Sequence, residues 1–159
     1  MKRVKFFSVT FRVMITLFSS ILFLYACSSP DQPFVQTPDG VHFMSGTPEQ
    51  AFEQGKKENK AVFLFAHASY CASCKKMKLS VFPDKAVGDV FNPKFINAEV
   101  DIESEAGKKI VDRFNIEGTP TLLFLQPGGQ LIKKISGYES SEELVALAKD
   151  LGTDGVRQN

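Results

Sequence analysis

Apolar and polar positions fall into blocks along the chain, and the blocks predict an alternation of strands and helices. Three short runs between polar flanks, 61–66, 95–100 and 121–125, are largely apolar. Such runs are typical of strands that are buried on both faces. A fourth strand is predicted over 131–135, because Pro127-Gly128-Gly129 is a strong signal for a turn that reverses the chain. Residues 41–43 are a further short strand candidate.

Helices are predicted between these strands. The expected segments are 48–59, a helix opened by Cys71, a short helix after Pro83, 105–114, and a last helix from Ser140 or Ser141 to Leu151. Thr47 and Gln50 have the spacing of a capping box at the first of them. This order predicts an α/β fold, a central mixed sheet of four to five strands covered by helices on both faces. The domain is expected over 41–151, with a frayed tail over 152–159.

Composition and charge narrow the class of protein. Hydrophobic residues make up 43% of the 159 positions and charged residues 23%, which is ordinary for a globular domain. The formal net charge is +1, so nothing suggests a nucleic-acid binder. Four of the basic residues fall within the first 26 positions, and the remainder has 15 basic and 18 acidic residues. Three cysteines are too few for a disulfide-stapled mini-protein.

The N-terminal segment has the pattern of an export signal. Lys2, Arg3 and Lys5 precede an uncharged run of 14 residues, Val13 to Ala26. A membrane-spanning helix needs roughly 20 residues, so a cleaved signal peptide over 1–26 is the favoured interpretation. The alternative is an uncleaved anchor, which would place Arg12 near the membrane centre.

The signal ends in Leu24-Tyr25-Ala26-Cys27, which resembles the bacterial lipoprotein box apart from Tyr25. By that resemblance Cys27 is the acylated N-terminus, and residues 27–40 are a lipidated, Pro-rich flexible tether. We therefore expect a lipid anchor at the periplasmic face of a bacterial membrane. Ser28, where some lipoproteins carry a retention aspartate, favours the outer membrane. The alternative is a chance cysteine beside an ordinary cleavage site.

The candidate chemistry lies in Cys71-Ala72-Ser73-Cys74, directly after a buried strand and at the start of a helix. Two intervening residues bring both sulfurs within disulfide reach, and the helix N-terminus favours the thiolate of Cys71. Lys75 and Lys76 add positive potential. The predicted role is a redox pair in which Cys71 attacks and the more buried Cys74 resolves. A structural disulfide, half of a zinc site and two inert buried cysteines are the alternatives.

Residues 48–151 resemble the thioredoxin family, and more closely its periplasmic branch that includes the C-terminal domain of the transmembrane thiol reductant transporter. The resemblance rests on the CxxC motif joined to Gly118-Thr119-Pro120-Thr121, with Pro120 46 residues after Cys74. Further matching stretches are Asn59 to Ala66, Val81-Phe82-Pro83-Asp84 and Val100-Asp101.

The resemblance implies roles for several residues. Pro120 would be cis and lie against the disulfide, and Thr119 would present its backbone to an extended substrate. A trans proline that starts a strand is the alternative. Tyr70 stands where thioredoxins carry tryptophan and could shield the sulfur as part of the substrate site.

The family's buried aspartate is replaced by Phe65 in this chain, which motivates a hypothesis about Glu99. Glu99 falls where the family has a buried lysine, and it could supply the missing proton acceptor. The alternative is a solvated charge at the end of a strand. His67 could tune the thiolate, but a histidine at this position more often simply packs beneath the active-site loop, so it stays outside the predicted site.

These observations predict a membrane-tethered periplasmic thiol–disulfide oxidoreductase that reduces disulfides in exported proteins. No cofactor and no metal are expected. The expected partners are proteins with disulfides, a thiol protein that donates electrons, and the membrane through the lipid; we expect a monomer. The alternatives are a non-catalytic thioredoxin-fold binding module and a metal chaperone. The direction of exchange is left open by the sequence.

Overall fold

A computed structural model describes residues 39–154 of the chain, with the side chains of 152–154 excepted. The predicted signal peptide, Cys27 and nearly all of the predicted tether lie outside the described residues. Within the described part, no helix is long and apolar enough to cross a membrane.

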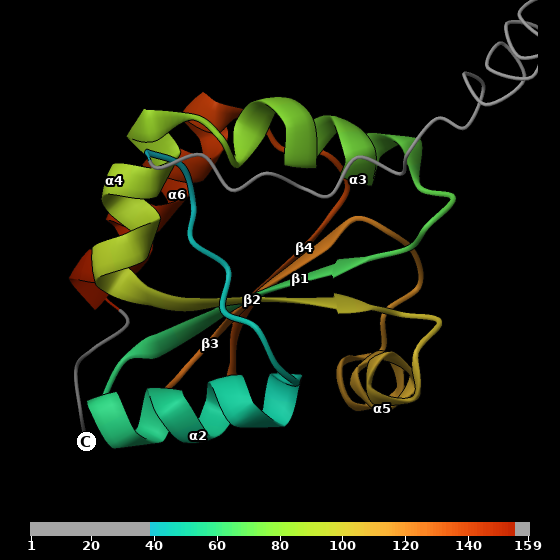
Figure 1. Ribbon diagram of the computed structural model, residues 1–159. Coiled ribbons are helices and arrows are strands. Elements are labelled where there is room, and N and C mark those ends of the chain that lie inside the picture. The colour runs from blue at the N-terminus through green and yellow to red at the C-terminus, as the bar shows by residue number, and fades with distance from the viewer. Residues whose placement is uncertain (1–38, 155–159) are drawn as a thin grey trace, which may run out of the picture. The chain divides into compact units, whose positions relative to one another are not determined.

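Four strands form one mixed sheet at the centre of the domain (Figure 1). They are β1 (Ala61–His67), β2 (Phe95–Asp101), β3 (Thr121–Leu125) and β4 (Leu131–Ser136), in the spatial order β2-β1-β3-β4. β1 and β2 are parallel, whereas β3 is antiparallel to both β1 and β4. The predicted α/β fold with a mixed sheet is confirmed, with four strands.

The strand candidate at 41–43 is reduced to a single bridge. Phe43 pairs in parallel with Asn97 of β2, and the N–H of Met44 donates to the carbonyl of Asn97. The ladder does not extend, because the N–H of His42 donates instead to the side chain of Asn92, 2.9 Å away. The segment is therefore held against the edge of β2 partly by side chains.

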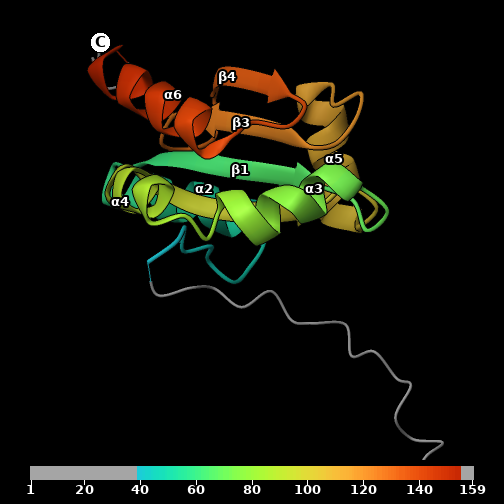
Figure 2. The ribbon, with the colours of Figure 1, turned by 90° about the horizontal axis from the view of Figure 1, so that it is seen from above.

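The helices cover both faces of the sheet. They are α2 (Pro48–Glu58), α3 (Ala72–Lys76), the π-helix η2 (Met77–Val81), α4 (Lys85–Lys94), α5 (Glu105–Phe114) and α6 (Ser141–Asp154). α3, α4 and α6 lie on one face, and α2 and α5 on the other (Figures 1 and 2). The capping box predicted for Thr47 and Gln50 is present, and the Ser140 hydroxyl caps α6.

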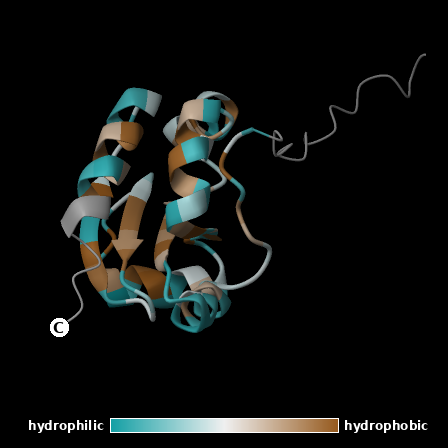
Figure 3. Cartoon of the chain, turned by 90° about the vertical axis from the view of Figure 1, so that its left-hand side faces the viewer, coloured by the Kyte–Doolittle hydropathy of each residue, from teal (hydrophilic) through white to brown (hydrophobic). Residues whose placement is uncertain are grey.

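Two apolar cores fill the space between the sheet and its helices, and the strands carry most of the hydrophobic colour in Figure 3. The core beneath α3, α4 and α6 is rich in phenylalanine. Phe63 lies at its centre, with ring centroids 4.9 Å from Phe91 and 5.1 Å from Phe124. Both cysteines of the CxxC motif belong to this same core. The redox pair is therefore fixed to the most densely aromatic part of the domain.

The helix that begins at the CxxC motif departs from the sequence prediction in one respect. The pattern predicts an ordinary helix from Cys71 past Met77, but the second half is a π-helix, in which the N–H of Phe82 donates to the carbonyl of Met77. A π-turn inside a helix often marks a functional segment. Here it joins α3 to the Phe82-Pro83 break that precedes α4.

Candidate functional site

Cys71 and Cys74 form a disulfide at the start of α3. Their sulfurs are 2.07 Å apart and their Cα atoms 5.2 Å apart. Cys71 is the N-cap residue of α3, and its sulfur accepts a hydrogen bond from the backbone N–H of Cys74 at 3.1 Å. An amide that donates to this sulfur favours a negative charge on it once the disulfide is reduced. The sequence prediction of two sulfurs within bonding reach at a helix start is matched by this geometry.

The two cysteines differ little in accessibility. Cys71 is 7% exposed and Cys74 is 2% exposed in the disulfide form. Cys71 is thus the more accessible of the two, as predicted, although both are buried. Tyr70 precedes the pair and is 70% exposed, so its ring projects into solvent beside the disulfide and is accessible to another protein.

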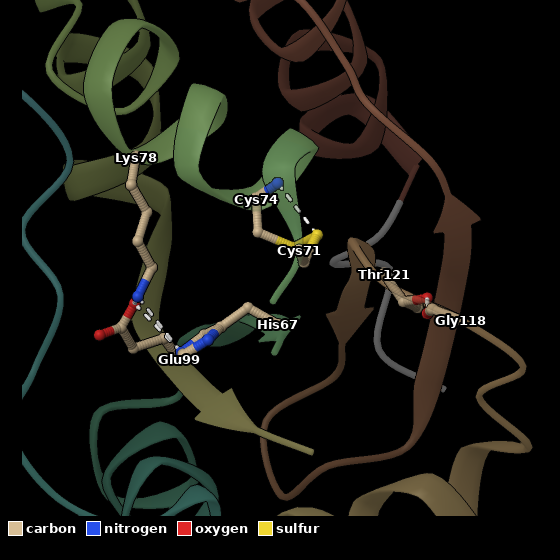
Figure 4. The surroundings of a disulfide bond; sticks show 7 residues. All are labelled: His67, Cys71, Cys74, Lys78, Glu99, Gly118 and Thr121. Atoms are coloured by element: carbon tan, nitrogen blue, oxygen red, sulfur yellow. Dashed lines mark hydrogen bonds and ion pairs between the residues drawn. A yellow bond between two sulfur atoms is a disulfide. The ribbon is translucent and has the colours of Figure 1, made fainter. Parts of the chain in front are cut away.

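The segment Gly118–Thr121 lies at the same end of the sheet as the disulfide. Thr121 pairs with Ala66 near the end of β1, and Cys71 follows that end by a short loop. The Thr119–Pro120 peptide bond is cis. The Thr121 hydroxyl donates to the carbonyl of Gly118 at 2.7 Å, and the carbonyl of Pro120 accepts from the N–H of Gly137. These bonds fix the loop on the side of the disulfide opposite Glu99 (Figure 4).

Glu99 lies in a small cluster of charged side chains on the disulfide face of the sheet. Its Oε2 atom is 2.7 Å from Nζ of Lys78 and 3.8 Å from Nε2 of His67 (Figure 4). Its side chain is 32% exposed, and those of Lys78 and His67 are 20% and 16% exposed. Glu99 is therefore neither fully buried nor a freely solvated charge at a strand end, but the half-buried partner of a lysine.

The register of the strands explains why this cluster faces the disulfide. Phe65 of β1 pairs directly with Glu99 of β2, and side chains at paired positions point to the same face of a sheet. Phe65 is fully buried in the core that holds Cys71 and Cys74. An aromatic ring thus fills the place expected to hold an acid, and Glu99 lies beside it on the next strand.

His67 carries no positive charge in this environment at neutral pH. Burial lowers the pKa of His67, and the neighbouring ammonium of Lys78 lowers it further, against the opposing effect of Glu99 and Asp101. Nζ of Lys78 is 3.2 Å from Nε2 of His67. An ammonium group can only donate, so Nε2 is the accepting nitrogen and the ring proton lies on Nδ1.

Lys78 is the member of the site that the sequence analysis missed. Lys75 and Lys76 were expected to supply the positive potential, but both are exposed, and Nζ of Lys76 lies 4.5 Å from the ring centroid of Tyr138. Lys78 instead turns inward from η2. Its spacing of four residues from Cys74 places both on one helix face and is the signal that could have identified it.

The described residues contain no group of three or more histidine, cysteine, aspartate or glutamate side chains arranged to hold a metal ion.

Residues 48–152 match the family model described as a thioredoxin-like domain, which covers most of the chain. The chain belongs to the thioredoxin-like family. It is 29% identical over 131 residues to a protein disulfide-isomerase of Datisca glomerata, covering 82% of this chain and 24% of that protein. It is 30% identical over 94 residues to the thiol:disulfide interchange protein DsbD of Pasteurella multocida, covering 57% and 16%.

A solved structure supports the same assignment. A candidate disulphide-isomerase from Bacteroides thetaiotaomicron superposes with a TM-score of 0.64 at 29% identity, over 79% of this chain and 100% of that one. The thioredoxin-like chain spans about a quarter or less of the length of the two curated relatives. The two curated relatives and the solved structure carry the names of thiol–disulfide exchange proteins, and the chain belongs to the same thioredoxin-like family.

Proposed function

We propose that this thioredoxin-like protein is a thiol–disulfide oxidoreductase, tethered by lipid at the periplasmic face of a bacterial membrane, that reduces disulfides in exported proteins. The observation that carries the proposal is the Cys71–Cys74 disulfide at a helix start, with the Gly118–Thr121 loop at the same end of the sheet. A disulfide that closes so short a loop adds little to stability, so its position is better explained by reactivity.

The exchange has two steps when the enzyme starts in its reduced form. The Cys71 thiolate attacks one sulfur of a substrate disulfide, and the other substrate sulfur leaves as a thiolate that takes up a proton. Cys74 then loses its proton and attacks Cys71. The enzyme disulfide forms, the mixed disulfide breaks, and the second substrate sulfur leaves as a thiolate and is protonated. The substrate gains two electrons and the enzyme loses two.

The assignment of Cys71 as the attacking sulfur follows from its surroundings. It is the more accessible of the two, and it accepts the Cys74 N–H, which stabilises a thiolate. Cys74 is nearly fully buried and can reach only a partner already bonded to Cys71. When Cys71 attacks first, the later attack of Cys74 on Cys71 breaks the mixed disulfide and releases the reduced substrate.

The substrate chain is proposed to lie along Thr119 and Pro120. The carbonyl of Pro120 is already occupied by the N–H of Gly137, so the backbone of Thr119 is the group proposed to pair with an extended segment. Tyr70, which directly precedes Cys71, provides an exposed aromatic surface. An extended chain with one disulfide is the substrate that such an arrangement fits.

Glu99 is proposed to accept the proton of Cys74 in the second step. β2 places its carboxylate on the disulfide face, directly beside Phe65. Replacing it in a Glu99→Gln variant is expected to change the pH dependence of the resolving step, measured by stopped-flow exchange. An unchanged pH profile would reject this role.

Lipid attachment at Cys27 and a thiol protein that returns electrons complete the proposal. The similarity to DsbD supports an electron donor of the thiol:disulfide interchange class. The reduction potential of the purified chain against glutathione determines whether it acts as a reductase, and a potential well below that of glutathione is expected.

Insulin reduction tests the proposed activity. The full chain, supplied with dithiothreitol, is expected to accelerate insulin precipitation, and Cys71→Ser is expected to abolish the acceleration. Lys57→Ala, on the outer face of α2, is the matched control and is expected to retain it. Equal activity in wild type and Cys71→Ser, or none in wild type, would favour a binding module whose disulfide is only structural.

A further inference from the structure

The helical segment that follows the disulfide, Ala72–Val81, carries three lysines, and one of them turns toward the sheet. Lys75 and Lys76 are exposed to solvent. Lys78 extends beneath the helical segment, and its Nζ is held 2.7 Å from Glu99 and 3.2 Å from His67 (Figure 4). Its ammonium is therefore a half-buried charge in a fixed position. Electrostatic interactions of such a charge are stronger than those of a charge at the surface, because less water screens them.

Lys78 and Cys74 occupy neighbouring positions on one face of the helix. Side chains four residues apart on a helix have Cβ atoms roughly 5–6 Å from each other. Figure 4 shows both side chains directed from the helical segment toward the strands. Both side chains therefore lie on the sheet side of the helical segment, with the ammonium of Lys78 held at Glu99.

The remaining surroundings of Cys74 oppose a negative charge. The sulfur lies in an apolar core with Phe65, Met77 and Phe82, all fully buried. Burial among apolar groups raises the pKa of a thiol. A thiolate that must form there during the resolving step requires compensation by a nearby positive charge.

We propose that Lys78 is a positioning residue of the exchange reaction, whose ammonium stabilises the thiolate of Cys74 as it attacks the mixed disulfide. The inference deepens the proposed function and rests on it. The electron and proton balance is that of the second step above: Cys74 gives up a proton, bonds to Cys71, and releases the substrate thiolate.

The charges around Lys78 set the strength of this effect. Glu99 on β2 partly neutralises the ammonium, while His67 at the end of β1 is uncharged and orients it by accepting a hydrogen bond. Asp101, the pairing partner of His67, raises the pKa of that imidazole by less than Glu99 does. Removing Lys78 and removing Glu99 must therefore act in opposite directions on the thiolate.

The direct test measures the ionisation of Cys74 in a Cys71→Ser background of the full chain. The rate of alkylation by iodoacetamide is followed against pH by mass spectrometry of the peptide that contains Cys74, which separates it from Cys27. Adding Lys78→Met is expected to slow alkylation about tenfold at pH 7, because one pKa unit is a tenfold change in thiolate. Lys78→Arg is expected to restore the rate.

Lys75→Met is the matched control, because it removes an exposed charge directly beside Cys74. It is expected to change the rate by about twofold or less, since solvent and salt screen exposed charges. If Lys78→Met and Lys75→Met give the same profile, the proposed role of Lys78 is wrong, as it is if Lys78→Arg fails to restore the rate.

A second arm reverses the sign and does not depend on the folding of Lys78→Met. Glu99→Gln in the same background removes the carboxylate that partly neutralises Lys78 and is expected to speed alkylation several-fold at pH 7. Slower or unchanged alkylation contradicts the proposal. These rates need no catalytic turnover, so they separate a wrong role for Lys78 from a wrong proposed function, which the insulin assay tests.

Discussion

An aromatic ring and an ion pair lie together on the disulfide face of the sheet, formed by Phe65, Glu99 and Lys78. Phe65 fills the space beneath the pair with an apolar ring, and Lys78 lies over that ring with its Nζ 5.9 Å from the centroid. Glu99 holds the lysine from the next strand. The ion pair thus joins the helical segment that follows the disulfide to β2.

His67 provides a prediction for pH-dependent stability. Its pKa in the folded chain is lowered, first by burial and then by Lys78, so the unfolded chain binds this proton more readily than the folded one. The free energy of unfolding is therefore expected to fall as the pH drops below about 6.5, and to be fully retained above it. One proton corresponds to a slope of at most about 1.4 kcal/mol per pH unit.

Urea unfolding between pH 5 and 7.5 measures this slope. His67→Gln is expected to flatten it, whereas His42→Gln, which replaces the other histidine, is expected to leave it in place. A wild-type slope that survives in His67→Gln would show that other groups cause the loss of stability in acid.

At the scale of elements, the segment before α2 is bound to the domain by the side chain of Asn92 in α4. Its oxygen accepts the N–H of His42, and its amide donates to the carbonyl of Gly40 at 2.9 Å. It also accepts from the amide of Asn97 on β2, 3.2 Å away. One residue therefore joins the N-terminal segment, a helix and a strand.

Replacing Asn92 is expected to loosen this segment without affecting the redox pair. In Asn92→Ala, the loss of three hydrogen bonds is expected to lower the free energy of unfolding by about 1–3 kcal/mol. Amide hydrogen exchange at Val41 and Met44 is expected to speed up. Gln54→Ala, which removes an exposed hydrogen bond to Glu58, is the control. Unchanged exchange in Asn92→Ala would mean that the apolar contacts of Val41 and Phe43 alone hold the segment.

At the scale of the whole molecule, hydrophobic pattern alone accounts for most of the architecture. The continuous apolar runs form β1 and β3, because a strand covered on both faces needs no polar side. The turn after β3 lies where the pattern predicts it, since Gly128 and Gly129 both adopt positive φ angles. The redox pair can also be located from the sequence, because a CxxC motif at a strand-to-helix corner is typical of thiol–disulfide exchange sites.

Features that depend on exact helix phase and on contacts between distant elements could not be predicted in this way. The π-turn over Met77–Val81 has no distinct residue signature, so the inward direction of Lys78 is indicated by its spacing from Cys74 and not by the turn itself. The bridge at Phe43 is shorter than its apolar pattern suggests, because Asn92 competes for the N–H of His42. The length of this bridge is set by a residue far away in the chain.

Trapping of the mixed disulfide tests most directly that Cys71 attacks and Cys74 resolves. The reduced Cys74→Ser chain, mixed with an oxidised disulfide-containing protein, is expected to accumulate a covalent adduct through Cys71 that dithiothreitol releases. The reduced Cys71→Ser chain is expected to form little, because Cys74 is nearly fully buried. Equal adduct at both cysteines, or none at either when mapped by mass spectrometry, would contradict the account.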